Sequence, residues 1–179
     1  MTDLLIGCGG KQDKLVFPEP RGWTDLCTLD INPDHKPDVV HDLEQLPLPF
    51  ADEVFEEIHA YEVLEHTGRQ GDYRFFFAQF TEFWRLLKPG GHLCGSVPLP
   101  SSIWAWGDPS HTRVLSLETF TFLDQSQYTE QVGVTTMSDF RYLYKADFSL
   151  IYSGLRGESQ LFALRAMKPS RITQPPQPR

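Results

Sequence analysis

The run Leu4-Leu5-Ile6-Gly7-Cys8-Gly9-Gly10 is the most informative short segment of the sequence. Its three consecutive apolar residues are typical of a short strand that is buried within a sheet. The glycines that follow predict a tight turn, because glycine adopts backbone angles that other residues rarely reach. The next part of the chain repeats this pattern of a buried strand followed by a turn.

Further strands are predicted by short apolar runs that end at turn residues, at 25–30, 38–42, 56–61 and 92–97. Large apolar side chains at three-to-four spacing predict one amphipathic helix from Asp72 to Lys88, ended by Pro89-Gly90-Gly91. Alternating strands and crossovers are typical of an α/β domain with a mostly parallel sheet.

The connecting segments are predicted with less regular structure. Prolines and a glycine in 11–24 indicate an irregular crossover, and 101–107 is expected to be a loop that carries two tryptophans. A short helix is predicted at 117–123, and runs at 149–155 and 160–167 predict an antiparallel hairpin. We therefore expect a single domain over 1–167, followed by a proline-rich, disordered tail over 168–179.

Composition excludes several classes of protein. A chain of 179 residues is long enough for one domain with a sizeable core. Its net charge of -8 disfavours nucleic acid as a partner, since non-specific binding needs a basic face. We expect a cytoplasmic protein, because the sequence shows neither a membrane-spanning apolar segment nor a secretion signal. The three cysteines (Cys8, Cys27 and Cys94) predict buried thiols rather than disulfides or a zinc knuckle.

Acidic residues after the early strands point to a nucleoside ligand. Ligands of an open parallel sheet bind at the carboxyl ends of its strands, where the glycine turn, Asp30 and Asp42 are expected to lie. Asp30 follows Gly9 by 21 residues, close to the interval at which a carboxylate binds a ribose. A dinucleotide is disfavoured, because Gln12 stands at the third glycine position of its fingerprint. Adenosine joined to an amino acid suits the segment better.

Five segments in this order resemble the class I S-adenosylmethionine-dependent methyltransferases, and most of all a small bacterial branch of them. They are LIGCGG at 5–10, LDINP at 29–33, VVHDL at 39–43, VLEH at 63–66 and LLKPGGHL at 86–93. The resemblance covers roughly residues 4–167. It implies a Rossmann-like, mostly parallel seven-stranded sheet whose last strand runs antiparallel, and S-adenosylmethionine as the cofactor.

By this resemblance, Gly7 and Gly9 let the backbone approach the methionine part of the cofactor. The ribose is held by Asp30, with Ile31 beside it, and the adenine edge is read by Asp42 and the Leu43 amide. The reactive sulfonium is bordered by Tyr61 and Glu62.

Two departures from the family pattern are visible. Many relatives carry an acidic residue where this chain has Leu5. The helices that usually precede the first strand are missing, so we expect the lid over the site to come from 104–113 or from a second subunit of a homodimer.

On the acceptor side, His111 and His66 are candidate general bases, and Arg113 could orient an anionic acceptor. The alternatives are that His111 only hydrogen-bonds across a turn begun by Asp108 and that His66 has a capping or packing role. Metal is disfavoured, since the histidines are scattered and the pair Glu65-His66 has no partner at ligand spacing.

The expected function is methyl transfer to an oxygen or nitrogen of a small molecule, such as a saccharide. After the fourth strand the chain reads AYEV at 60–63, which matches neither motif of the nucleic-acid base methyltransferases. The alternative is a catalytically weak or inactive member of the fold that binds an adenosyl ligand or a protein partner. A nicotinamide oxidoreductase is the third and least favoured interpretation.

Overall fold

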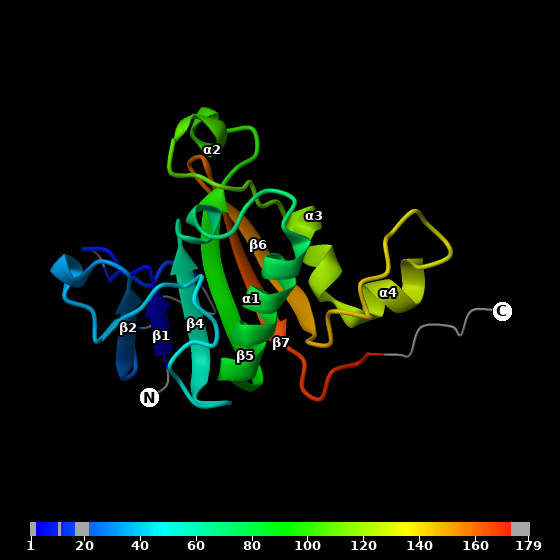
Figure 1. The fold of residues 1–179 in the computed structure, drawn as a ribbon, viewed down its shortest axis with the longest axis horizontal. Coiled ribbons are helices and arrows are strands. Elements are labelled where there is room, and N and C mark those ends of the chain that lie inside the picture. Colours follow the sequence, from blue (N-terminus) through cyan, green and yellow to red (C-terminus); the bar gives the residue numbers. More distant parts are fainter. Residues whose placement is uncertain (1–2, 11, 17–21, 173–179) are drawn as a thin grey trace.

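The computed structural model describes residues 3–10, 12–16 and 22–172, and these form one α/β domain built on a seven-stranded sheet (Figure 1). The strands are β1 Asp3–Ile6, β2 Leu26–Asp30, β3 Val39–Val40, β4 Phe55–Tyr61, β5 Leu87–Pro98, β6 Phe148–Arg156 and β7 Ser159–Ala166. The α-helices are α1 Tyr73–Leu86, α2 Ile103–Gly107, α3 Leu117–Phe120 and α4 Gln125–Gln131. Short 3-10 turns are η1 Pro33–His35, η2 Leu64–His66 and η3 Thr121–Leu123.

The order of the strands across the sheet is β3-β2-β1-β4-β5-β7-β6. The five strands from β3 to β5 pair in parallel, whereas β7 runs antiparallel to both β5 and β6. The predicted Rossmann-like sheet with an antiparallel last strand is therefore confirmed. The order reverses at β1, where the chain switches from β2 on one side to β4 on the other, and ligands of such sheets bind at that point.

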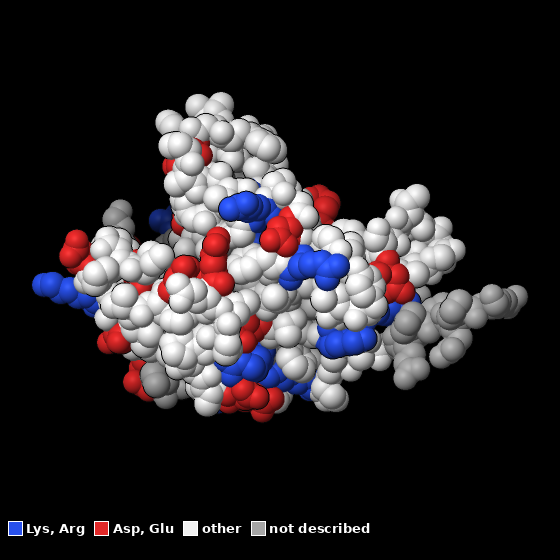
Figure 2. Space-filling view, viewed as in Figure 1, with Lys and Arg blue, Asp and Glu red and all other residues white. Residues whose placement is uncertain are grey.

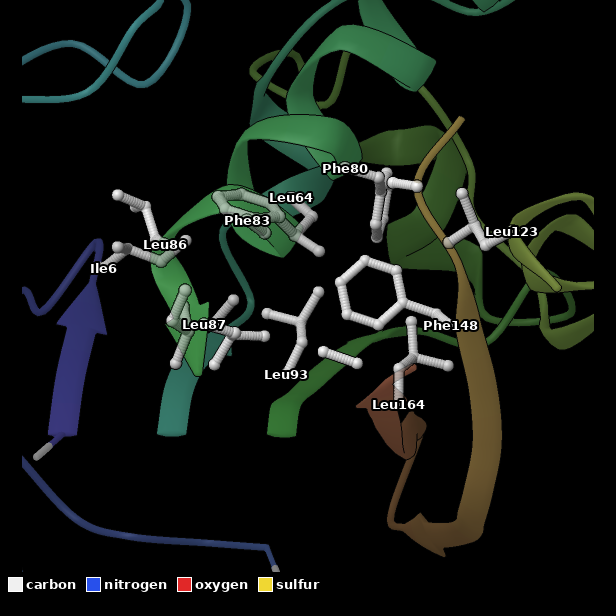
Figure 3. Close-up of a cluster of buried hydrophobic side chains, with 14 of the residues drawn as sticks. Ile6, Leu64, Phe80, Phe83, Leu86, Leu87, Leu93, Leu123, Phe148 and Leu164 are labelled. Atoms are coloured by element: carbon white, nitrogen blue, oxygen red, sulfur yellow. The ribbon is translucent and has the colours of Figure 1, made fainter. Parts of the chain in front are cut away.

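Helix α1 covers one face of the sheet and supplies a row of phenylalanines to the core. Asp72 caps it by accepting a hydrogen bond from the Phe75 N–H at 3.0 Å, as predicted. Its buried face carries Phe80 and Phe83, which pack on apolar residues of the strands (Figure 3). Fully burying one such side chain contributes roughly 1.5–3 kcal/mol, so this face fixes the position of α1.

The end of α1 differs from the prediction. The helix ends at Leu86, and Pro89-Gly90-Gly91 belong to β5 instead of a turn after the helix. Leu87 already pairs with Phe55 of β4, and a Cβ on Gly91 would lie 2.8 Å from the Glu56 carbonyl oxygen. Glycine is required there because the two strands approach closely, a long-range cause that local patterns do not report.

The opposite face of the sheet is covered in part by the loop between β1 and β2. Val16 is buried there against Cys94, Leu161 and Ala163. The Tyr61 hydroxyl accepts hydrogen bonds from the Leu15 and Val16 N–H groups at 3.0 and 3.2 Å. Residues 12–16 and 22–24 contain no helix, in agreement with the predicted irregular crossover, whereas 11 and 17–21 lie outside the described residues.

The segment between β5 and β6 is more helical than predicted. Residues 103–107 form α2, capped by the Ser102 hydroxyl, where a loop was expected. The short helix predicted at 117–123 is present as α3 and η3 behind Ser116. Helix α4 was not predicted, because its polar sequence gives no apolar period and its place is set by the buried side chains of Gln125 and Tyr128. Figure 1 shows α2 standing beyond the end of β5, away from the rest of the domain.

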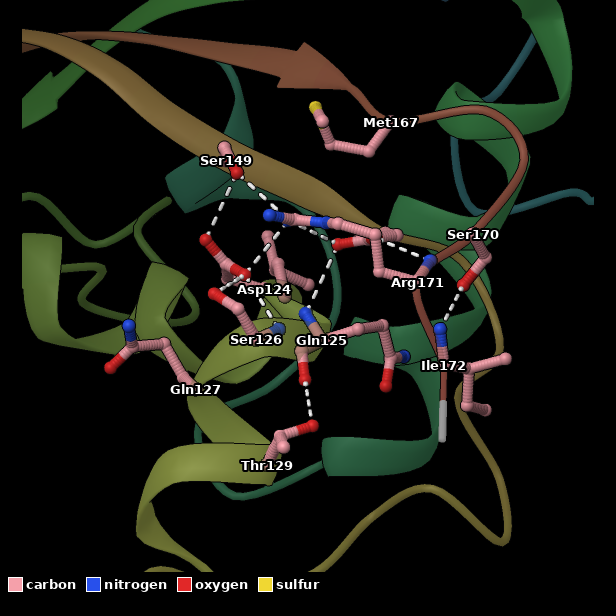
Figure 4. A network of polar contacts seen from close by, with 12 residues as sticks. Asp124, Gln125, Ser126, Gln127, Thr129, Ser149, Met167, Ser170, Arg171 and Ile172 are labelled. Atoms are coloured by element: carbon pink, nitrogen blue, oxygen red, sulfur yellow. Dashed lines mark hydrogen bonds and ion pairs between the residues drawn. The ribbon is translucent and has the colours of Figure 1, made fainter. Parts of the chain in front are cut away.

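Residues 168–172, which the sequence assigned to the tail, are held on the domain. The Arg171 side chain forms ion pairs with Asp124 and Asp147 at 2.9 and 2.8 Å and donates to Ser149 (Figure 4). This network ties the chain after β7 to the start of α4. The rest of the predicted tail, 173–179, lies outside the described residues.

No helix in the described ranges is long and apolar enough to span a membrane. On the face shown in Figure 2, described Lys and Arg side chains are interspersed with Asp and Glu, so that face carries no broad basic stretch among these residues.

Candidate functional site

The glycine turn after β1 takes the backbone conformation expected from its sequence. Gly7 and Gly9 have φ of +58° and +52°, in the left-handed region that favours glycine. A Cβ on Gly7 would collide with the Val63 side chain, whereas a Cβ on Gly9 or Gly10 would meet nothing within 4 Å. Gly7 therefore serves the close approach of two loops, and Gly9 leaves open space above the turn.

Asp30, the last residue of β2, connects this turn to the next one. Its carboxylate accepts hydrogen bonds from the N–H groups of Gly9 at 2.9 Å and Asn32 at 2.8 Å, and His35 Nδ1 lies 3.2 Å from it. Burial opposes its ionisation, but the Asn32 and Gly9 amides and His35 outweigh burial and hold the pKa of Asp30 below its ordinary value. The side chain is 8% exposed and is therefore a fixed negative charge at the carboxyl end of β2.

A cavity of about 510 Å³, which we call the Asp30 cavity, opens beside this carboxylate. Its walls come from the turns after β1, β2, β3 and β4. Seven of the eight predicted cofactor residues line it: Gly7, Gly9, Asp30, Ile31, Asp42, Leu43 and Glu62. Four carboxylates are among its lining residues, namely Asp30, Asp42, Glu44 and Glu62, so the cavity favours a cationic or hydroxyl-rich ligand.

A second cavity of about 630 Å³, the Tyr61 cavity, lies on the other side of the glycine turn and shares Gly7 and Gly9 with the first. Its lining includes Tyr61, the eighth predicted cofactor residue, and the apolar Leu5. It also includes Asp13 from the loop after β1 and Arg156 from the end of β6. A carboxylate and a guanidinium in one cavity complement the two charges of an α-amino acid.

The structure assigns a second use to two of the predicted residues. The Tyr61 hydroxyl is engaged with the Leu15 and Val16 amides and with His59 Nδ1 at 2.7 Å, so Tyr61 positions the loop after β1. Asp42 accepts the Glu44 N–H at 2.9 Å, as in an ordinary turn, while its side chain still borders the Asp30 cavity. Neither contact tests binding of a ligand, and the cofactor roles of both residues stay predictions.

The two candidate bases lie together, but only one borders the Asp30 cavity. The rings of His66 and His111 meet edge to face, with centroids 4.7 Å apart. His66 lines the Asp30 cavity, whereas His111 and Glu65 line a separate small space. Burial raises the pKa of the Glu65 carboxyl to about 8. Asp108 does begin a turn, since it accepts the Ser110 N–H at 2.8 Å.

Arg113 does not face the site as predicted. Its guanidinium is buried and donates to the Leu64 carbonyl at 2.9 Å, to Thr67 Oγ1 at 3.0 Å and to Gln79 Oε1 at 2.5 Å. It supports η2 from beneath and is committed to these partners. Nε and Nη2 are used inside the domain, which disfavours a contact with an acceptor but does not test one, so the expected role of Arg113 in orienting an anionic acceptor stays a prediction.

Sequence reasoning missed two residues and one contact near the site. Asp13 could have been found, since a carboxylate shortly after the glycine turn falls on the methionine side of the expected ligand. The sequence gave no local signal for Arg156 or for the contact of His111 with Glu65-His66, because Arg156 and His111 lie in chain segments far from the motifs. The order of the strands places Arg156 near the site, and the path of residues 99–113 places His111 there.

Comparison with known proteins agrees with this geometry. The family model described as "Methyltransferase domain" matches residues 4–95, slightly more than half of the chain of 179 residues. No curated protein matches the sequence significantly.

Solved structures share the fold at low sequence identity. N-methyltransferase NodS from Bradyrhizobium japonicum WM9, in complex with S-adenosyl-l-homocysteine, is 18% identical, with a TM-score of 0.52 over 92% of this chain and 77% of that one. A SAM dependent methyltransferase from Archaeoglobus fulgidus is 14% identical, with a TM-score of 0.54 over 92% and 85% of the two chains. One from Methanosarcina mazei is 13% identical, with a TM-score of 0.53 over 93% and 92%.

The family match spans β1 to β5, the part of the chain that builds both cavities apart from Arg156. Together with the fold neighbours it indicates S-adenosylmethionine as the cofactor, as the sequence motifs predicted. The chain belongs to the methyltransferase domain family.

Proposed function

We propose that the protein transfers the methyl group of S-adenosylmethionine to an oxygen or nitrogen of a small molecule, such as a saccharide. The observation that carries the proposal is the pair of cavities joined at Gly7 and Gly9, one with Asp30 at its wall and the other with Asp13 and Arg156. When bound, the cofactor supplies an electrophilic methyl group on a sulfonium. The protein's task is to align it and exclude water.

The residues present fit this cofactor. The space above Gly9 and Gly10 is open, since a Cβ on either glycine would meet no atom within 4 Å, and a ligand therefore has room against the turn. Ionised Asp30 is an acceptor for ribose hydroxyls, and the carboxylates of the Asp30 cavity favour a cation. In the Tyr61 cavity, we assign the amine of the methionine part to Asp13, which takes the place of the acidic residue absent at Leu5, and we assign its carboxylate to Arg156.

The experiment is calorimetric titration of the protein with three ligands. They are S-adenosylmethionine, S-adenosylhomocysteine and methylthioadenosine, which lacks the amino-acid group. For Asp13→Asn and Arg156→Gln we expect each affinity for the first two ligands to fall about 10-fold, the loss of one hydrogen-bonded charge contact. Affinity for methylthioadenosine should not change.

One control variant and two results that would contradict the proposal complete this experiment. Glu158→Gln, on the turn of the same hairpin but outside both cavities, should bind all three ligands like the parent protein. Equal losses for methylthioadenosine would overturn the assignment of Asp13 and Arg156. Absence of binding at millimolar concentrations of all three ligands would overturn the cofactor site itself.

One observation favours the alternative of a binding protein without activity, namely the buried, apolar Leu5 in the wall of the Tyr61 cavity. Transfer of a labelled methyl group to pooled metabolites separates the two. Incorporation that disappears in Asp30→Ala supports the enzyme, whereas tight cofactor binding with no incorporation supports the binding protein.

A further inference from the structure

Three side chains with metal-binding groups meet beside the Asp30 cavity, although the sequence analysis expected no metal site. Glu65 and His66 come from η2, and His111 comes from the loop after α2. One ligand atom of each lies within 4.8 Å of the other two, and within the described residues no other cluster of three or more such side chains is found. His111, which is distant in the sequence, is thus the third ligand that the pair Glu65-His66 lacks locally.

Unsatisfied polar atoms mark this cluster. Glu65 is 2% exposed, and both of its carboxylate oxygens are buried with no hydrogen-bond partner. His111 Nδ1 is buried and without a partner in the same way. The nearby Arg113 guanidinium donates to Leu64, Thr67 and Gln79 and not to the Glu65 carboxylate. Burying such groups unpaired costs several kcal/mol unless a proton or a cation satisfies them.

The second nitrogen of each histidine faces the partner that a metal-binding histidine commonly has. His66 Nδ1 lies 3.2 Å from the Ser110 carbonyl oxygen, so it carries the proton and Nε2 keeps its lone pair. His111 Nε2 lies 3.9 Å from an Asp108 carboxylate oxygen, too far for a direct hydrogen bond, while the buried Nδ1 has no partner and is available to an ion. Carbonyl and carboxylate groups in these positions orient ligand histidines in known metal sites.

The backbone holds the two segments in register. The N–H groups of Thr112 and Arg113 donate to the Glu65 carbonyl oxygen at 2.9 and 3.3 Å. The His111 loop is thereby fixed against η2 without any contribution from a ligand. A site that is organised in advance in this way loses little conformational entropy when an ion binds.

We propose that Glu65, His66 and His111 bind one divalent ion of the Zn²⁺ class, with an open coordination position toward the Asp30 cavity. Two imidazoles and one carboxylate form the ligand set of open zinc sites. In a tetrahedral site with bonds of about 2.1 Å the ligand atoms stand about 3.5 Å apart. The exposed His66 side chain is the one that can rotate to close the remaining gap, and it lines the cavity.

This inference replaces the role of the two histidines as bases, because a nitrogen bound to a metal has no lone pair for a proton. It goes beyond the proposed function and does not depend on it, since ion binding is measured without cofactor or acceptor.

The test is titration of the chelator-treated full chain with ZnCl₂, followed by calorimetry and by metal analysis after dialysis. We expect one ion per chain, and a visible absorption spectrum typical of tetrahedral coordination when Co²⁺ is used instead. Glu65→Gln keeps the shape of the side chain but removes the anionic ligand, so affinity should fall at least about 10-fold. His111→Gln should do the same.

The matched control is His41→Ala, since His41 lines the same cavity but its Nε2 lies 2.8 Å from the Gln45 carbonyl oxygen, outside the cluster. It should bind Zn²⁺ like the parent protein. Zn²⁺ should also raise the melting temperature of the parent and of His41→Ala, but not that of Glu65→Gln, with circular dichroism showing that each variant is folded. Less than half an ion per chain in the parent, or equal affinity in the parent and Glu65→Gln, would overturn the site.

Discussion

The two sides of the Asp30 cavity are held in different ways. On the glycine-turn side, one carboxylate, Asp30, binds the main-chain N–H groups of Gly9 and Asn32. On the side of η2, which we call the His111 side because the His111 loop is bonded to η2, buried side chains carry the structure, since Arg113 joins η2 to α1 through Thr67 and Gln79. A turn built on main-chain groups leaves a recognisable sequence motif. A side assembled from distant side chains leaves none.

Arg113→Leu is expected to have the largest effect and would break the His111 side. The substitution removes three hydrogen bonds and leaves the buried Gln79 Oε1 without its hydrogen-bond donor, so the free energy of unfolding should fall by about 3–5 kcal/mol. Denaturant unfolding measures it, and the exposed Arg69→Leu is the control. A loss below 1 kcal/mol would contradict this structural role of Arg113.

Asp30→Ala is expected to have the next largest effect, on the glycine-turn side. Loss of a fixed carboxylate that accepts ribose hydroxyls should weaken binding of S-adenosylhomocysteine about 100-fold, or about 3 kcal/mol. Asp34→Ala is the control, because Asp34 is exposed on the neighbouring turn η1 and lies outside the cavity. Unchanged affinity in Asp30→Ala would show that the carboxylate only holds the two turns together.

The same contrast explains what could be predicted from sequence. The sheet followed from apolar runs and glycine turns, whose signals are local, and all eight predicted cofactor residues line the two joined cavities. The hydrogen bonds of Arg113 inside the domain and the helical structure of α2 could not be predicted. They depend on Gln79, Thr67 and Ala105, which become neighbours only after folding. The end of α1 was misplaced for the same reason, since strand pairing of Leu87 with Phe55 decides it.

A pH experiment sharpens the comparison on the side of the loop after β1. Glu57 in β4 pairs with Lys14 of that loop at 2.5 Å and with His59 at 2.9 Å. Although burial opposes ionisation, these partners lower the pKa of Glu57 from 4.5 to about 2. A carboxyl whose pKa is lower in the folded state stabilises the fold above its unfolded pKa, and this stabilisation is lost as the pH falls from 4.5 toward 2.

Glu57→Gln should therefore lower the free energy of unfolding at neutral pH by about 2 kcal/mol, after allowance for partial exposure of the pair. The difference from the parent protein should shrink steadily between pH 4.5 and 2. Denaturant unfolding over this range measures it. Glu56→Gln is the neighbouring control, since Glu56 pairs with Lys88 on the surface and should change stability by no more than about 1 kcal/mol. A difference that does not vary with pH would contradict the assignment.

The smallest effect is expected at α2, where the His111 side meets solvent. Trp104 is 60% exposed, whereas Ala105, the next residue of the same helix, is 4% exposed and anchors α2 to the domain. Trp104→Ala should change the free energy of unfolding by less than about 0.5 kcal/mol, as exposed positions usually do, while Ala105→Asp should destabilise the domain through a buried charge. Thermal unfolding of the two variants decides whether Trp104 is free to contact another molecule. A loss of 2 kcal/mol in Trp104→Ala would mean that the Trp104 ring packs on the domain and supports the fold. The exposed part of the His111 side would then be packed as tightly as the buried part that Arg113 holds.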